Sequence, residues 1–128
     1  MLAVDTNVVV RLLVRDDPEQ YEQALQLFDR DTIFVTKTVL LEAEWVLRFI
    51  YRLAMADVGR ALAAMIALPN VWCEDETEIT QALAWHREGL DFVEALHLAA
   101  SRQATRFVTF DRAMIKAAKR QGLPVSTP

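Results

Sequence analysis

LAVDTNVVVRLLV, residues 2–14, joins two kinds of secondary structure within thirteen residues. The apolar run that ends at Asp5 predicts a short buried strand, and residues 6–14 predict a helix despite their β-branched valines. An acidic side chain therefore stands where a strand passes into a helix. In an open parallel sheet, this carboxyl end of a strand is the place where functional sites form.

The same alternation of strand and helix continues to the other end of the chain. Helical spacing of apolar residues fills the intervals between further predicted strands, which lie at residues 32–35, 71–73, 106–110 and 124–127. This alternation predicts an α/β fold with a central, mainly parallel sheet of four to five short strands flanked by helices. A length of 128 residues fits a single domain spanning residues 1–128.

Composition excludes several classes of protein. Hydrophobic residues make up 53% of the chain, which excludes disorder, and the net charge of -4 argues against a broadly basic nucleic-acid-binding surface. The single Cys73 can form no internal disulfide and no zinc cluster, which suits a reducing compartment. The N-terminus lacks the basic segment of a signal peptide, and the longest apolar run, at 61–68, is too short to cross a bilayer. We therefore expect a cytoplasmic protein without a membrane partner.

Five acidic residues are placed where the predicted sheet would form a site. Asp5 ends the first strand, Asp111 follows the strand at 106–110, Glu42 lies in the helix after the second strand, and Asp91 and Glu94 open the helix before the fourth. Clustered carboxylates repel one another unless a cation neutralises them or some are protonated. Ligand sets made only of oxygen suit Mg²⁺ or Mn²⁺, so this distribution favours metal-assisted hydrolysis.

Each of these acids also has a structural explanation. Asp5 and Asp111 stand at strand-to-helix junctions, where Asp is a common helix N-cap. Asp91 and Glu94 have the spacing of a capping box. The sequence by itself leaves both explanations open.

Four motifs, in this order and spacing, resemble the PIN-domain nucleases, and most closely the VapC-type toxins of toxin–antitoxin pairs. They are VDTNVVVRLL (4–13), TKTVLLEAEWVL (36–47), GLDFVEALHLAA (89–100) and FVTFDRAM (107–114). The resemblance covers nearly the whole chain. It implies a Mg²⁺-dependent endoribonuclease, with Mn²⁺ as a possible alternative ion, that cleaves RNA as the toxin of a type II pair. It also implies a cognate antitoxin protein and a homodimer.

The resemblance assigns three of the four acids by motif. Asp5 is the first, with Thr6 and Asn7 completing its DTN motif. Glu42 is the second, because it directly follows two aliphatic residues. Glu44, about 200° away around the helix, does not match and is expected to be packing or an exposed charge. Asp111 is the fourth, with Thr109 and Arg112 as supporting residues.

The third acid departs from the family pattern. VapC-like proteins often read DFADAL here, and this chain reads DFVEAL, so Glu94 takes the place of the second Asp while Asp91 is kept as a supporting residue. Glu adds one methylene of reach and keeps the charge. The resemblance thus implies Asp5, Glu94 and Asp111 as metal ligands, with Glu42 orienting or deprotonating water.

Other side chains carry weaker expectations. Isolated cations are usually solvated, but four of them are candidates for RNA phosphates: Arg11, Arg15, Arg112 and Lys116. His86 and His97 lack metal-ligand spacing, so we expect core or surface roles for both. Part of the aromatic stretch 45–51 is a candidate groove for an antitoxin helix.

Two rival interpretations follow from the same residues. One is a PIN-fold nuclease or RNA-binding module outside toxin–antitoxin systems, with catalysis weakened by the Glu at position 94. The other is a receiver-like phosphoacceptor, which needs an acidic pair after strand one and a later Lys at a strand end. Asp5 stands alone and FVTFD contains no Lys, so the receiver has little support.

Overall fold

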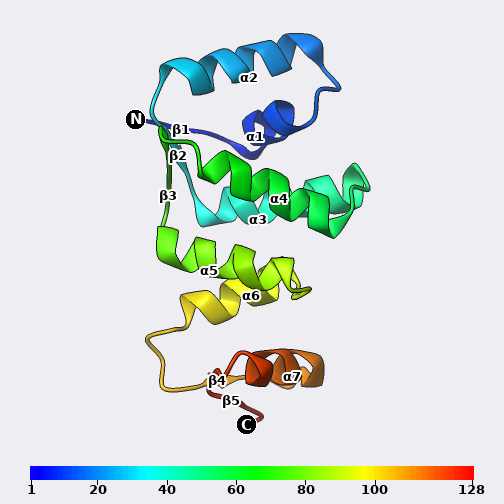
Figure 1. Cartoon of the computed structure of the whole chain (residues 1–128), viewed down its shortest axis with the longest axis vertical. Helices are drawn as coiled ribbons and strands as arrows, with labels where there is room; N and C mark the ends of the chain where they lie inside the picture. Colours follow the sequence, from blue (N-terminus) through cyan, green and yellow to red (C-terminus); the bar gives the residue numbers. More distant parts are fainter.

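The computed structural model describes all 128 residues, and its helices and strands alternate along the chain (Figure 1). In chain order the elements are β1 (Leu2–Ala3), α1 (Thr6–Leu13), α2 (Pro18–Arg30), β2 (Ile33–Val35), α3 (Lys37–Trp45), the π-helical segment η1 (Val46–Ile50), α4 (Met55–Ile66), β3 (Val71–Cys73), α5 (Glu76–Arg87), α6 (Phe92–Ala100), β4 (Phe107–Val108), α7 (Arg112–Arg120) and β5 (Val125–Ser126).

The five strands belong to two parallel sheets. The main sheet has the order β1-β2-β3, with Ile33 opposite Leu2 on one side and Val71 on the other. β4 and β5 form a separate two-stranded sheet. The predicted α/β class with parallel strands is confirmed. The five strands are not joined in one sheet. The sequence pattern could not show this, because it marks residues as extended, whereas the partner of a strand depends on where the helices carry the chain.

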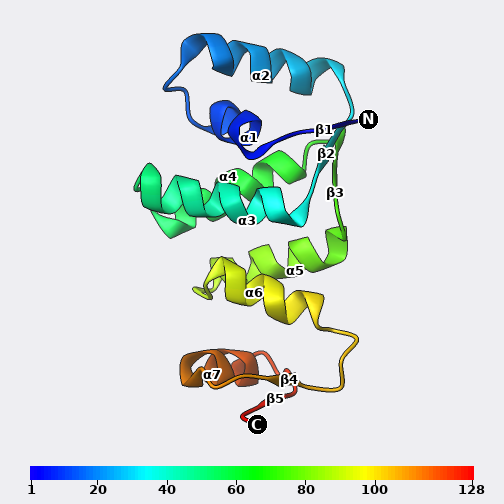
Figure 2. The same cartoon turned by 180° about the vertical axis from the view of Figure 1, so that it is seen from behind.

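The molecule is long in one direction. β4, α7 and β5 lie at one end of it and α1 and α2 at the other, and the views from opposite sides agree (Figures 1 and 2). We call residues 104–128 the C-terminal unit. α3, α4, α5 and α6 lie between the two ends.

One hydrophobic cluster of 24 buried residues runs through the molecule. Fully buried side chains such as Ile33, Leu40 and Phe92 lie in it, and each comes from a different element. Met114 and Ala118 of α7 belong to the same cluster, so α7 attaches the C-terminal unit to the rest of the protein. None of the helices has the length and apolar character needed to span a bilayer.

β1 is more exposed than its sequence predicts. Leu2 is 43% exposed and Ala3 is also exposed, whereas Val4, just after the strand, is buried. The reason is the position of β1 at the edge of the sheet, where it has β2 on one side and no strand on the other. Strands of parallel sheets are normally covered on both faces, so this exposure is unusual.

The long helix predicted from residue 36 is divided. α3 passes without a break into η1, whose wider π turn changes which side chains face outward. Leu47 is buried, while Trp45 and Phe49 are exposed and lie with ring centroids 5.8 Å apart.

Candidate active site

Asp5 lies directly after β1 and caps α1. One oxygen of its carboxylate accepts a hydrogen bond from the amide of Thr6 at 2.8 Å. The Thr6 side chain is buried and Asn7 is exposed. Because Asp5 is itself exposed, its second carboxylate oxygen remains free to bind another group.

Asp111 occupies the equivalent place after β4 and caps α7. Its Oδ1 accepts hydrogen bonds from the amides of Ala113 at 2.9 Å and Met114 at 3.1 Å. Its own amide donates to Oγ1 of Thr109 at 3.1 Å, which fixes the turn between the strand and the helix. Both capping hydrogen bonds use Oδ1, so the start of α7 does not occupy Oδ2 of Asp111.

Asp91 caps α6 and is held by an arginine. Its Oδ2 accepts from the amides of Val93 at 3.1 Å and Glu94 at 3.3 Å, and its Oδ1 accepts from Nη2 of Arg48 at 3.1 Å. Both oxygens of Asp91 are therefore engaged. The cap explanation is correct for Asp5, Asp91 and Asp111, although a cap that uses one oxygen does not prevent metal binding by the other.

Glu94 has no capping role and stands in an unfavourable electrostatic environment. Burial raises the pKa of its carboxyl group, and the negative charges of Asp111 and Asp91 and a hydrogen bond with Asp111 raise it further. A bound cation would neutralise these charges and so stabilise the ionised form of the Glu94 carboxyl group. The donors available, all carboxylate oxygens, fit a hard divalent ion such as Mg²⁺ or Mn²⁺.

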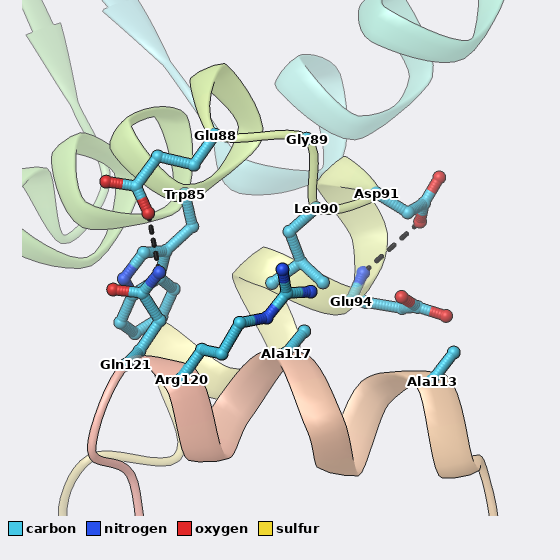
Figure 3. A pocket seen from close by; sticks show the side chains of 10 residues that line it. All are labelled: Trp85, Glu88, Gly89, Leu90, Asp91, Glu94, Ala113, Ala117, Arg120 and Gln121. Atoms are coloured by element: carbon cyan, nitrogen blue, oxygen red, sulfur yellow. Dashed lines mark hydrogen bonds between the residues drawn. The ribbon is translucent and has the colours of Figure 1, made fainter.

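A cavity of about 420 Å³ lies beside Glu94 (Figure 3). One wall is formed by Leu90 and Asp91, which lie between α5 and α6, and by Glu94 in the first turn of α6. α7 forms the other wall with Ala117 and Arg120. Oε2 of Glu88 accepts a hydrogen bond from Nε2 of Gln121 across one end of it. The cavity therefore has an acidic side on α6 and a cation from α7.

The predicted site residues do not form a single group in this structure. No three His, Cys, Asp or Glu side chains are arranged to hold a metal ion. Glu94 is close to Asp111 and Asp91, but Asp5 and Glu42 are not among the charges that act on it. Glu42 is exposed on α3, and Arg112 is exposed at the start of α7. Their assignment to one active site stays a prediction.

A sequence model of the PIN domain matches residues 2–120, nearly the whole chain. This chain belongs to the PIN domain family. PIN domains are nucleases and generally use divalent metal ions. No curated protein matches the sequence. Among solved structures, the chain is similar to Mycobacterium tuberculosis VapC20, described as a sarcin–ricin loop cleaving toxin, with 22% identity, full coverage of both chains and a TM-score of 0.46.

The PIN domain also contains a buried charged group that the sequence pattern did not assign to the site. Glu44 is only 2% exposed, and its Oε1 lies 3.0 Å from Nε of Arg48 and 3.3 Å from Nε2 of His86. Arg48 then reaches Asp91, so a charged chain runs from the core to the cap of α6. The i,i+4 spacing of Glu44 and Arg48 was the available signal.

His86 and His97 have the structural roles expected of them. His86 is buried against the edge of Phe92, with ring centroids 5.5 Å apart, and His97 is exposed. A Cβ at Gly59 would lie 2.7 Å from Nδ1 of His86, so this position has no room for a larger residue. Burial raises the pKa of the Cys73 thiol to about 11, with a smaller contribution from Glu76, so the thiol stays protonated at neutral pH.

The basic residues of the PIN domain differ in whether they already have a partner within the protein or are free to bind an anion. Arg11 is paired with Asp16 and hydrogen-bonded to Tyr51, and Arg15 stacks 4.7 Å from the centre of the Tyr21 ring. Four exposed cations on α7 have no such partner in the structure; they form what we call the α7 basic face, Arg112, Lys116, Lys119 and Arg120.

Proposed function

We propose that this PIN domain is an endoribonuclease that depends on Mg²⁺ or Mn²⁺ and serves as the toxin of a type II toxin–antitoxin pair. The observation that carries the proposal is the Glu94 carboxyl group. It is partly buried beside Asp111 and Asp91, its pKa is raised, and it adjoins a helix with four free cations. The acidic group of Glu94, Asp111 and Asp91 would be stabilised by a bound metal cation, and the basic side chains of α7 would be stabilised by phosphate. This combination suits a nuclease that acts on a phosphodiester.

Asp5, Glu94 and Asp111 would hold the metal ion, which would polarise the phosphodiester and lower the pKa of a water. Glu42 orients the attacking water and accepts its proton. Oγ1 of Thr109 accepts a hydrogen bond from the amide of Asp111. The hydroxyl proton of Thr109 can therefore be donated to a phosphate or a carboxylate. The buried Thr6 orients the start of α1 next to Asp5.

The direct test is cleavage of an unstructured RNA by the full chain with Mg²⁺, Mn²⁺ or EDTA. We expect cleavage with either metal, none with EDTA, and a loss of roughly a hundredfold or more in Asp5→Asn. Asn is as good an N-cap as Asp, so this variant keeps the helix start. Glu88→Gln removes one negative charge from the wall of the cavity beside Glu94, outside the proposed ligand set, and serves as the control.

Two outcomes would contradict the proposal: undiminished cleavage in Asp5→Asn, or cleavage that persists in EDTA. RNA binding without any cleavage would support the rival interpretation, an RNA-binding module that has lost catalysis.

The α7 basic face is expected to bind RNA phosphates. Each phosphate neutralised on single-stranded RNA contributes about 0.7 to the slope of log affinity against log salt concentration. Lys116→Gln should therefore lower that slope by about 0.7 and weaken binding equally for different RNA sequences. Arg60→Gln, on α4 and already paired with Asp57, should leave the slope unchanged. Fluorescence anisotropy across a salt series measures both; an unchanged slope in Lys116→Gln would exclude this face.

The antitoxin is proposed to cover an aromatic patch on α3 and η1 and the residues that follow, Trp45, Phe49, Ile50 and Leu53. All four side chains are exposed, and an amphipathic helix can lie on such a surface. We expect the chain to arrest growth in a bacterial host and a small neighbouring gene to relieve the arrest. Phe49→Ser should abolish the relief and keep the arrest, whereas Trp72→Ser, an exposed aromatic on β3, should change neither.

A further inference from the structure

β1 leaves one side of the main sheet open. The amides of Leu2 and Val4 donate to Thr32 and Phe34 of the β2 segment, at 2.8 and 3.3 Å. Successive amides along a strand point to opposite sides, so the amide of Ala3 points to the side that has no strand. An open parallel edge with exposed apolar residues is a surface on which another strand can add.

β4 has a matching open edge in the second sheet. The amides of Phe107 and Thr109 donate to Pro124 and Ser126, at 2.9 and 3.0 Å, so the amide of Val108 points away from β5. Val108 is 53% exposed. Nearby, Phe110 is 82% exposed, more than any other large hydrophobic side chain in the protein.

The two parts of the chain that carry these edges have opposite charge. The C-terminal unit has one acidic residue, Asp111, and five basic ones, Arg106 and Arg112 together with three on the rest of α7, for a net charge of +4. The preceding 103 residues have nine basic and seventeen acidic side chains, for a net charge of -8. Attraction between the C-terminal unit and the body of the protein therefore favours their association.

Within one chain these edges do not meet. β4 lies at one end of the long axis and β1 on the far side of α3–α6, and α7 is anchored to the core by Met114 and Ala118 (Figures 1 and 2). A second copy of the chain has no such restriction. Two copies side by side can place each β4 on the other's β1, which closes the assembly with both open edges covered.

We propose that two copies of this chain form a reciprocal dimer in which β4 of each pairs in parallel with β1 of the other. Ala3 is followed after two residues by Asp5, and Val108 after three by Asp111. A parallel pair therefore brings Asp5 of one protomer to the same end as Asp111 of the other, with Glu94 beside Asp111. The metal role of these acids rests on the proposed function; the strand pairing does not.

Cross-linking tests the pairing without reference to activity. In a Cys73→Ser background, chains with Ala3→Cys and chains with Val108→Cys are co-expressed and treated with a short bismaleimide. We expect a covalent dimer, and a native mass of twice the chain's 14.6 kDa. Thr80→Cys on α5 replaces Ala3→Cys in the matched control and should give no dimer above background. A monomeric mass, no cross-link, or a cross-link that forms only within a chain carrying both cysteines would overturn the proposal.

Complementation tests whether the dimer shares its sites. Asp5→Asn and Asp111→Asn are each expected to be inactive alone. When co-expressed, half of the dimers combine one chain of each kind and hold one intact site, so activity should return to about a quarter of wild type. No recovery, with both variants dimeric, would overturn the shared site. If wild type itself fails to cleave RNA, the proposed function fails, and the cross-link still decides the pairing.

Discussion

Glu94→Gln is expected to lower RNA cleavage by roughly a hundredfold or more and, at neutral pH, to make the protein more stable to unfolding. The activity falls because the variant removes one charged ligand proposed for the metal ion. Stability rises because the wild-type carboxyl group is disfavoured in its charged form. Burial, followed by the charges of Asp111 and Asp91, raises its pKa in the folded protein.

The sign of the pH dependence follows from that shift. A carboxyl group whose pKa is higher in the folded than in the unfolded state favours folding when it is protonated. Its contribution is complete below the unfolded pKa, near 4.5, and is lost as the pH rises through the folded pKa. The stability difference between Glu94→Gln and wild type should thus be near zero at low pH and increase towards neutral pH.

Urea unfolding over a pH series measures this difference, with Glu88→Gln as the control that should follow wild type. Mg²⁺ should reverse the order, because it stabilises the folded wild type more than the variant. A variant that is less stable than wild type at neutral pH without metal would contradict the electrostatic account of Glu94.

Arg48→Met is expected to lower the free energy of unfolding by on the order of 3 kcal/mol, which corresponds to a fall in Tm of about 10 °C. Arg48 lies 3.0 Å from the carboxylate of Glu44, which is only 2% exposed. Without the guanidinium, the only remaining charged or polar partner of that carboxylate is His86, at 3.3 Å. The penalty is mainly that of leaving a buried carboxylate without its cation.

Adding Glu44→Gln to Arg48→Met should restore part of the lost stability, because it removes the uncompensated charge. A double-mutant cycle followed by thermal unfolding gives the coupling between the two side chains. Arg87→Met, an exposed position on α5, controls for the loss of an arginine and should change Tm little. Simple additivity of the Glu44 and Arg48 variants would show that the pair contributes no coupling.

The class of fold was predictable from sequence because it depends on local pattern. Apolar runs and helical spacing marked the strands and helices, and Asp5 and Asp111 marked the caps at two of the strand-to-helix junctions. The partners of β1 and β4 were not predictable in this way. Both strands have two residues, and nothing in so short a segment specifies which edge it pairs with.

The candidate site was also predictable only in part: the sequence indicated which acidic residues to consider but not which contacts they make. The acidic residues were chosen from their positions along the chain, and the structure brings Glu94 close to Asp111 and Asp91 but not to Asp5 or Glu42. The contact of Glu44 with His86 was missed, because it joins α3 and α5 across 42 residues of sequence. Contacts of that range depend on helix packing and leave no periodic pattern.

The helix caps bear on how such a protein would change over evolutionary time. Asp91 and Asp111 each accept two amides at the start of a helix, and Asp5 accepts one. A descendant that had given up metal binding would still be under selection to keep Asp or Asn at these places, because loss of an N-cap destabilises the fold. Glu94 caps nothing and weakens folding when charged, so selection for stability alone would discard it. Position 94 is therefore the one at which descendants that keep catalysis and those that lose it should differ most.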